Sequence, residues 1–156
     1  MLSGRVVERL VEEARRLDMT PEEYLLELLT RDLDPEDRAR EYVQAARDLL
    51  AEARVELERG NVRQAAEKVW GAAALAVKAY AYWRGGERLS SHGELWAYSL
   101  KVAGELGEWV KDAWSSAVHM HVCFYEGWCA REHVEAALER VGRLVEEVGR
   151  RVEEGS

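Results

Sequence analysis

Three histidines, His92, His119 and His121, are the residues of this sequence best suited to chemistry. An imidazole ring exchanges protons near neutral pH, so each could serve as a general acid or base, and each could also bind a metal. His119 and His121 stand two residues apart, so on a helix they point to nearly opposite sides and cannot hold one metal together. We take all three as candidate catalytic residues.

The two cysteines, Cys123 and Cys129, offer a second kind of chemistry. Cys123 follows His119 by four residues, a spacing that could supply half of a metal site. No second pair with ligand spacing occurs in the sequence, so we expect no metal and no cofactor. Two cysteines are too few for a disulfide framework, and we expect two reduced thiols in the core. His121 aligns with apolar residues of its helix, so a structural role is the alternative for it.

The segment WRGGERLSSHGELW, residues 83–96, could bind an anion. It carries arginines, glycines and serines just before a helix, and the free N–H groups and dipole at a helix start favour a negative ligand. The alternative is a plain tight turn in which Ser91 caps the helix. The phosphate-binding motif GxxxxGK[ST] is absent, which excludes a nucleotide site of that type.

Tryptophans flank the 83–96 segment and the predicted helix that carries His119 and His121. They could stack on nucleobases, as aromatic platforms with basic neighbours do. Alternatively, they fill a helical core and a dimer interface. The residues that we predict to bind a ligand come from the 83–96 segment and from the end of the histidine-bearing helix: Arg84, Arg88, Ser90, Ser91, His92, Trp96, Tyr125 and Glu126.

The net charge of the chain, −8 over 156 residues, argues against general nucleic-acid binding, which needs basic residues to neutralise phosphates. The segment from Asn61 to Lys101 differs, because it has six basic and three acidic residues. Any surface that meets an anion is therefore expected near this segment. Arginine far outnumbers lysine, and amide side chains are scarce, which favours a heat-adapted source.

Helical patterns position these residues along the whole chain, and no stretch alternates as a strand would. Thr20 with Glu23, and Ser91 with Glu94, match the capping box that starts a helix, so two helices are expected to begin there. Gly104 and Gly107 are expected to break the second of them. Apolar residues at intervals of three and four predict the other helices, over about residues 6–17, 35–60, 62–83, 108–126 and 130–153.

The predicted helix from Val62 to Trp83 is apolar on almost every side, which indicates that other helices surround it. Its alanines and Gly71 would let those neighbours approach closely. Lys78 is the exception, because its ammonium must either reach the surface or meet a carboxylate in the core.

These elements predict an all-α protein. The four long helices have short connections on either side, which favours an up-and-down four-helix bundle. We divide the chain into an N-terminal helical appendage, residues 1–33, and a bundle domain, residues 34–154. The appendage is expected either to pack on the bundle or to reach a second subunit.

The most apolar stretch, Val69 to Trp83, contains Lys78 and is shorter than the roughly 20 residues that cross a membrane. The first residues alternate in charge and show no apolar signal core. We therefore expect a cytoplasmic protein without membrane contact.

The run AAEKVWGAAALAVKAYAYWRGGERLSSHGELW and the later HMHVCFYEGW closely resemble the PaREP1 family of archaeal proteins. The resemblance covers roughly residues 35–153, and its ordered WGAA, SHxxLW and HxxFYEGW elements are specific. That family in turn resembles the HEPN superfamily of helical bundles, which are related to substrate-binding subunits of nucleotidyltransferases. The resemblance implies a HEPN-like bundle that commonly forms a homodimer.

Many HEPN proteins are ribonucleases with an arginine, then four to six residues, then a histidine. The positions at that spacing before His119 and His121 hold no arginine: Asp112, Ala113, Trp114, Ser115 and Ser116. Before His92, Arg88 stands too close and Arg84 too far. Without that arginine, cleavage next to a phosphate loses its main electrostatic aid, so we expect no ribonuclease of this type.

The favoured hypothesis is a non-catalytic, dimeric HEPN-like protein that binds a nucleotide or RNA, or docks on a nucleotidyltransferase-like partner. One alternative is an enzyme that processes RNA or a nucleotide through its histidines. The other is a purely structural protein that oligomerises through its N-terminal helices. The first is favoured by the fold resemblance, by the missing ribonuclease motif and by the net positive segment that lies beside aromatic residues.

Overall fold

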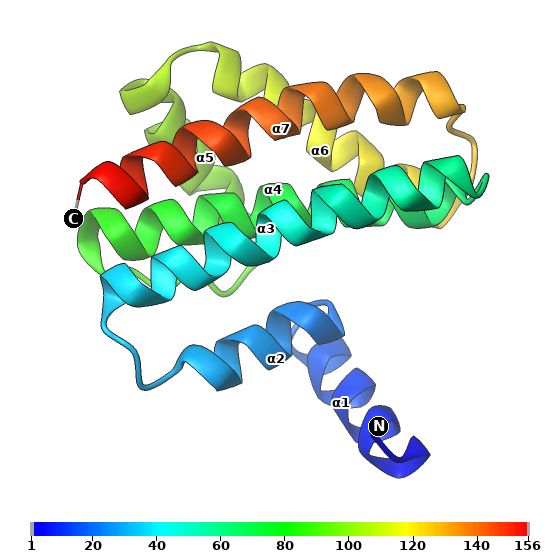
Figure 1. Cartoon of the computed structure of the whole chain (residues 1–156), viewed down its shortest axis with the longest axis horizontal. Coiled ribbons are helices and arrows are strands. Elements are labelled where there is room, and N and C mark those ends of the chain that lie inside the picture. The colour runs from blue at the N-terminus through cyan, green and yellow to red at the C-terminus, as the bar shows by residue number, and fades with distance from the viewer. Residues whose placement is uncertain (1, 156) are drawn as a thin grey trace.

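The computed structural model describes residues 2–155, and within that range the chain consists of helices without a strand (Figure 1). The prediction of an all-α protein is confirmed. The seven helices are α1 (Gly4–Arg16), α2 (Pro21–Thr30), α3 (Pro35–Glu58), α4 (Val62–Gly85), α5 (His92–Leu106), α6 (Trp109–Glu126) and α7 (Arg131–Glu154).

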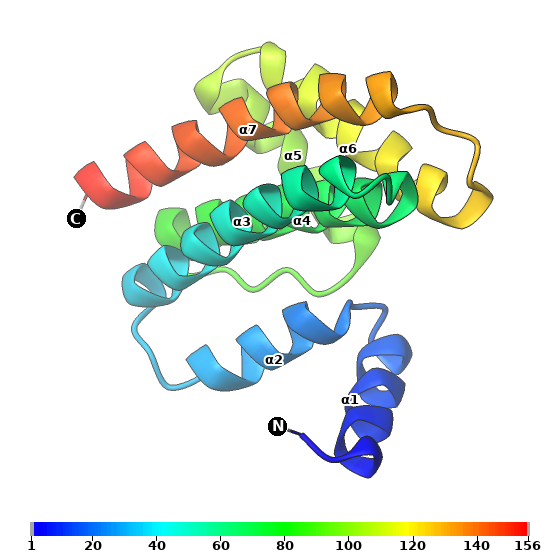
Figure 2. The same ribbon diagram turned by 45° about the vertical axis from the view of Figure 1, so that its right-hand side comes forward.

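Four long helices, α3, α4, α6 and α7, share one hydrophobic core, and α4 contacts each of the other three. We call these four helices the body. The short helix α5 packs against α4 and α6. Figures 1 and 2 both show α1 and α2 below α3, on the side away from α7. The body therefore leaves one of its sides to be covered by the first two helices, which we call the N-terminal hairpin.

Helix α4 is surrounded by other helices, as its sequence indicates. Every residue from Val69 to Tyr82 is buried. Small side chains make the close packing possible: a Cβ atom added to Gly71 would lie 3.2 Å from Cδ1 of Leu49 on α3. Because neighbours cover α4 on all sides, this helix has no polar stripe to keep in water.

The predicted helix starts are found at Thr20 and Ser91, whose side-chain oxygens accept from the backbone N–H of Glu23 (3.1 Å) and Glu94 (3.1 Å). Two local predictions need correction. The carboxylate of Glu23 does not return to the start of its helix, because it is used elsewhere. Gly104 does not break α5, which continues to Leu106; the predicted break at Gly107, where φ is +133°, is found.

Two ion pairs, together with a hydrogen bond from Arg38 to the carbonyl of Glu27, help to attach the N-terminal hairpin to the rest of the chain. Nζ of Lys78, in the middle of α4, lies 3.0 Å from Oε2 of Glu23, and the two side chains are only 5% and 7% exposed. Arg88, just after α4, pairs with Glu27 of α2. The lysine that the sequence left between two possibilities thus meets a carboxylate in the core.

A disulfide joins Cys123 to Cys129, with the two Cα atoms 5.5 Å apart. This corrects the expectation of two reduced thiols. Gly127, with φ of +73°, reverses the chain after α6 and brings the following loop back against the last turn of that helix. The pairing also removes Cys123 as a metal ligand beside His119.

None of the helices in the described part of the chain has the length and apolar character needed to cross a bilayer.

Candidate functional site

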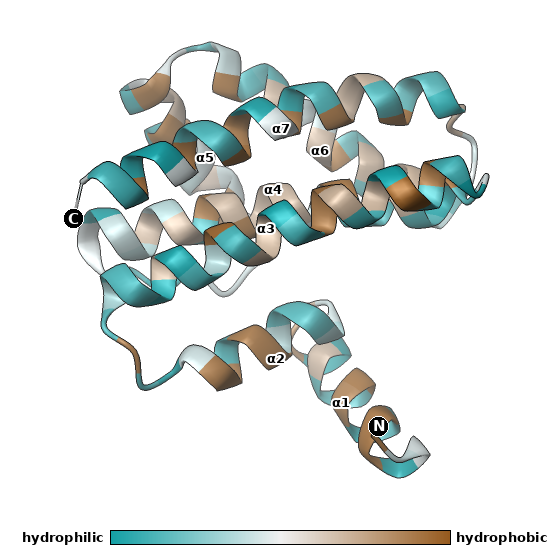
Figure 3. Ribbon diagram, in the orientation of Figure 1, coloured by the Kyte–Doolittle hydropathy of each residue, from teal (hydrophilic) through white to brown (hydrophobic). Residues whose placement is uncertain are grey.

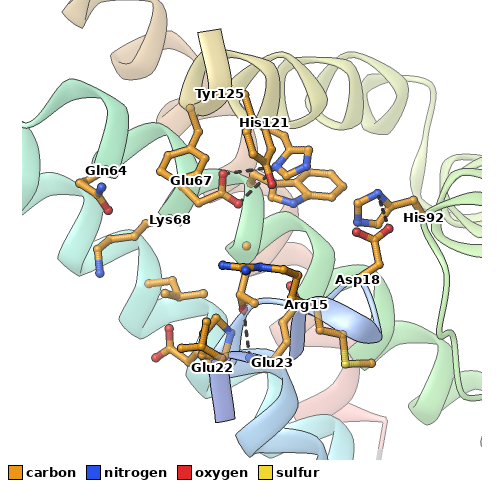
Figure 4. A pocket seen from close by; sticks show the side chains of 18 residues that line it. Arg15, Asp18, Glu22, Glu23, Gln64, Glu67, Lys68, His92, His121 and Tyr125 are labelled. Carbon is orange, nitrogen blue, oxygen red and sulfur yellow. Dashed lines mark hydrogen bonds and ion pairs between the residues drawn. The ribbon is translucent and has the colours of Figure 1, made fainter. Parts of the chain in front are cut away.

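A cavity of about 500 Å³ lies between the N-terminal hairpin and the body. We call it the hairpin pocket. Residues from α1 to α6 line it, and Figure 4 shows how their side chains converge. Its polar and titratable side chains include Arg15, Asp18, Glu22, Glu23, Gln64, Glu67, Lys68, His92, His121 and Tyr125.

Two of the three predicted histidines meet in this pocket. The ring centroids of His92 and His121 are 5.6 Å apart, and they lie 5.6 Å and 5.0 Å from the ring centroid of Trp70. Trp70 is buried, so it supports both imidazoles from below. Tyr125 completes the cluster from the end of α6, 5.0 Å from His121.

Each of these histidines faces a carboxylate. Nδ1 of His121 lies 3.2 Å and 3.3 Å from the two oxygens of Glu67, and Nδ1 of His92 lies 3.4 Å from Oδ2 of Asp18. A carboxylate at Nδ1 favours a proton on that nitrogen and leaves Nε2 available to a ligand. The pocket therefore presents two imidazoles, nearly perpendicular to each other, each of which has a carboxylate at Nδ1.

Asp18 holds its position at a conformational cost. Its φ is +57°, a left-handed conformation that ends α1, and the N–H of Met19 closes the turn on the carbonyl of Ala14 at 2.8 Å. Glycine or asparagine is the usual residue at this point, although aspartate also tolerates it. The turn thus brings a carboxylate to His92 where glycine would be the less strained choice.

Arg15, whose side chain is exposed, is a cation of the pocket without a partner among the described residues. Figure 4 shows its guanidinium group reaching from the hairpin into the middle of the pocket, towards Glu67 and His121. Its side chain makes no hydrogen bond or ion pair with another residue of the described range. Lys68, at the edge of the pocket, is instead paired with Glu52 at 3.1 Å. Arg15 is therefore free to bind an anion.

The acidic residues of the pocket differ in their neighbours. Glu23 is paired with Lys78, whereas Glu67 and Asp18 each face a histidine. Desolvation is the main cause that raises the pKa of Glu22, and the nearby carboxylate of Glu52 adds to it. Glu23 is therefore the carboxylate of the pocket whose charge a buried lysine balances.

The predicted anion-binding arginines are committed to other partners. Nε of Arg84 lies 3.1 Å from Oε1 of Glu105, and Arg88 pairs with Glu27. Neither arginine lines the hairpin pocket. Their positive charge is used to attach α5 and the N-terminal hairpin to the rest of the chain.

The predicted serines also have a partner within their own segment. The hydroxyl groups of Ser90 and Ser91 donate to Oε1 of Glu94, at 2.8 Å and 3.2 Å. These hydrogen bonds lower the pKa of Glu94, and the bond from the Ser90 hydroxyl has the largest effect. The donors at the start of α5 are thus occupied by a carboxylate of the chain, which is the plain capped turn considered as the alternative.

The remaining predicted residues are divided between the pocket and the surface. His92 and Tyr125 line the pocket, whereas Trp96 is half exposed on α5 with its ring against Trp114. Glu126 is exposed at the end of α6. His119 is exposed and lines a different cavity.

Sequence reasoning missed Arg15, Asp18, Glu67 and Trp70 as site residues. Trp70 lies in the recognised WGAA run, and Glu67 stands one helical turn before it, so the run itself was the available signal. Arg15 and Asp18 come from the N-terminal hairpin, and nothing in their local pattern points to a histidine that lies so much later in the chain.

Comparison with known proteins matches part of this structure to one family. The model of the archaeal PaREP1/PaREP8 family matches residues 41–145, a range that contains α4, α5 and α6 with most of α3 and α7. Neither the curated proteins nor the solved structures gave a match. Because the family model covers more than half of the chain, and includes Trp70, His92 and His121 of the pocket, the protein belongs to the archaeal PaREP1/PaREP8 family.

Proposed function

We propose that the protein binds a nucleotide, or the end of an RNA chain, in the hairpin pocket. The observation that carries this proposal is the exposed, unpartnered guanidinium of Arg15, which points into a pocket lined by aromatic and imidazole rings as well as by carboxylates. Arginine binds phosphate groups through paired, charge-assisted hydrogen bonds. A pocket of about 500 Å³ is within the usual range for sites of small ligands.

The rings of the pocket would hold the base of such a ligand. Tyr125 is largely exposed, and His121 and His92 are partly exposed, so flat faces remain accessible above the buried Trp70. Bases stack on aromatic and histidine side chains whatever their sequence. The two Nε2 atoms add polar groups that could contact the base or the sugar.

The fold part of the proposal is that α3, α4, α6 and α7 form a HEPN-like up-and-down bundle. Its support is the order of the long helices, the shared core and the WGAA, SHxxLW and HxxFYEGW elements. The arginine that the ribonuclease motif would place near a histidine in sequence is absent. In this chain an arginine reaches the histidines from α1 instead.

A titration with adenosine 5′-monophosphate, observed by NMR of the histidine side chains, tests the proposal. We expect the resonances of His92 and His121 to shift, and Arg15→Gln to weaken this binding by about tenfold or more, because a charge-assisted contact to phosphate is lost. Arg16→Gln is the matched control: Arg16 is adjacent, exposed and paired with Glu13. Equal affinity of the two variants would contradict the role of Arg15.

A second function, acid–base catalysis on RNA, is favoured by one observation: His92 and His121 face each other, and each has a carboxylate at Nδ1. One imidazole would take the proton of an attacking 2′-hydroxyl, and the other would protonate the leaving 5′-oxygen. In the same samples, a short RNA should then be cut by the native protein. His92→Gln and His121→Gln should each abolish cleavage, and an uncut RNA would leave binding as the function.

We also propose that the protein is a homodimer that associates through the N-terminal hairpin. Figure 3 shows hydrophobic residues along α1 and α2, and several of them are exposed: Val6, Val7, Leu28 and Leu29. Ala14 is the only buried residue of α1. A helix with a clear apolar stripe normally buries that stripe, so a second copy is the proposed cover. A nucleotidyltransferase-like partner is the alternative occupant.

A further inference from the structure

A second cavity, of about 390 Å³, lies between the end of α6 and the start of α7. We call it the α6–α7 groove. His119, His133 and Arg140 line it together with Ser116, Trp128 and the Cys123–Cys129 disulfide. None of its lining residues in the described range is acidic, although the chain as a whole carries a net charge of −8. The groove is therefore a basic, partly apolar site on an acidic protein.

Hydrogen bonds within the chain hold the side chains of Arg140 and His133, each of which can donate to a ligand. Nη1 of Arg140 donates to Oγ of the buried Ser116 at 2.9 Å, which holds one edge of the guanidinium and leaves its other N–H groups available. The backbone N–H of Ala130 donates to Nδ1 of His133 at 2.9 Å. Because Nδ1 accepts, the neutral ring carries its proton on Nε2 and offers a donor there.

An exposed ring stands beside these donors. Trp128 lines the groove and is 70% exposed, the second most exposed of the large apolar residues in the described range. The loop that carries it is tied to α6 by the disulfide between Cys123 and Cys129. A large aromatic side chain in water beside fixed donors has the arrangement of a stacking platform next to a phosphate site.

We propose that the α6–α7 groove binds a phosphate group that carries a planar ring, as in a nucleotide. Arg140 and Nε2 of His133 contact the phosphate oxygens, His119 adds a third polar contact, and the ring packs on Trp128. This site does not depend on the hairpin pocket. His119 and His121 point to nearly opposite sides of α6, so the two cavities lie on different faces of that helix.

The four histidines allow the two sites to be tested separately in one experiment. His119 and His133 line the groove, whereas His92 and His121 line the hairpin pocket. We expect adenosine 5′-monophosphate to shift the side-chain resonances of His119 and His133. Inorganic phosphate and adenosine, which each supply half of the ligand, should bind more weakly. Shifts of His92 and His121 alone would overturn the groove site and leave the pocket proposal intact, and the reverse result would do the opposite.

His133→Glu is the variant that best separates loss of ligand binding from loss of stability. His133 is the third residue of α7, and glutamate at that position accepts from the N-cap N–H in the capping-box arrangement. The helix start is thus preserved, and negative charge is favourable there. The phosphate, however, would meet a carboxylate in place of a donor. We expect an unchanged or higher Tm together with a loss of affinity of more than about tenfold.

Variants of Arg140 separate binding from a structural role. Arg140→Gln should lower the affinity by about tenfold or more, since the guanidinium contact is lost. Ser116→Ala removes the hydrogen bond to Arg140 but keeps the charge, so it should bind within about threefold of the native protein. Arg150→Gln, on the exposed side of α7, is the control for charge alone. Native affinity in both Arg140→Gln and His133→Glu would overturn the proposal.

Discussion

Replacement of Lys78 by methionine is expected to leave Glu23 without its partner at a site where its side chain is 7% exposed. Removal of one member of a buried ion pair typically costs about 3–5 kcal/mol, because the remaining charge is neither paired nor hydrated. Glu23 can avoid this cost by becoming hydrated, however. It belongs to the N-terminal hairpin, which makes few contacts with the body apart from its ion pairs. The hairpin can undock and return Glu23 to water.

The reciprocal change, Glu23→Gln, is expected to act in the same way. The ammonium of Lys78 meets a side chain of the hairpin, so it stays buried without a charged partner only while the hairpin is docked. We therefore expect both Glu23→Gln and Lys78→Met to increase amide hydrogen exchange in α1 and α2 while α3 to α7 stay protected.

Urea unfolding and hydrogen exchange on the same samples measure both effects. The double variant Glu23→Leu, Lys78→Met should recover most of the native stability, since an apolar pair needs no compensation. Lys68→Met breaks the more exposed pair with Glu52 and is the matched control, with an expected cost of less than about 1 kcal/mol. If Lys78→Met and Lys68→Met have equal effects, the buried pair does not attach the hairpin.

A glutamate in place of Leu29 or Val6 is expected to convert the proposed homodimer into a monomer. In a single copy these side chains are 78% and 50% exposed, so either change should alter the stability of the monomer by less than about 0.5 kcal/mol. In an apolar interface the same carboxylate would be buried without a partner, which costs several kcal/mol and shifts the equilibrium towards monomer.

Sedimentation velocity at several protein concentrations reports this change directly. Leu100→Glu is the matched control, because Leu100 is also an exposed leucine, 60% accessible, but lies on α5. The native protein and the control should sediment as dimers, and the two hairpin variants as monomers. A dimer that persists in both hairpin variants would place the interface elsewhere, and a native monomer would reject the proposal of a homodimer.

Local patterns in the sequence were sufficient to predict the helices and most of their ends. Helix formation depends on the spacing of apolar residues and on hydrogen bonds within a few residues, and both can be read from the chain. Thr20 and Ser91 begin helices as predicted, and α4 is buried as its apolar surface indicates. Gly104 shows the limit of such reasoning, since packing of α5 on α4 and α6 outweighs the low helix propensity of one glycine.

The sequence predicted only part of the candidate site. His92 and His121 stood out by residue type, but no local pattern shows that their rings lie 5.6 Å apart on Trp70. The arginines of the 83–96 segment stood out as well, yet Arg84 and Arg88 are bound to carboxylates of other helices. A charged side chain selects its partner by distance in space, which sequence spacing gives only within one helix.

The sequence by itself thus determined the all-helical class, the buried α4 and the family to which the chain belongs. The tertiary structure decided which histidines meet, which cations stay free and where Lys78 finds its carboxylate. The physical reason is the N-terminal hairpin. Its attachment depends on pairs between residues far apart in the chain, and it alone brings Arg15 and Asp18 to the histidines.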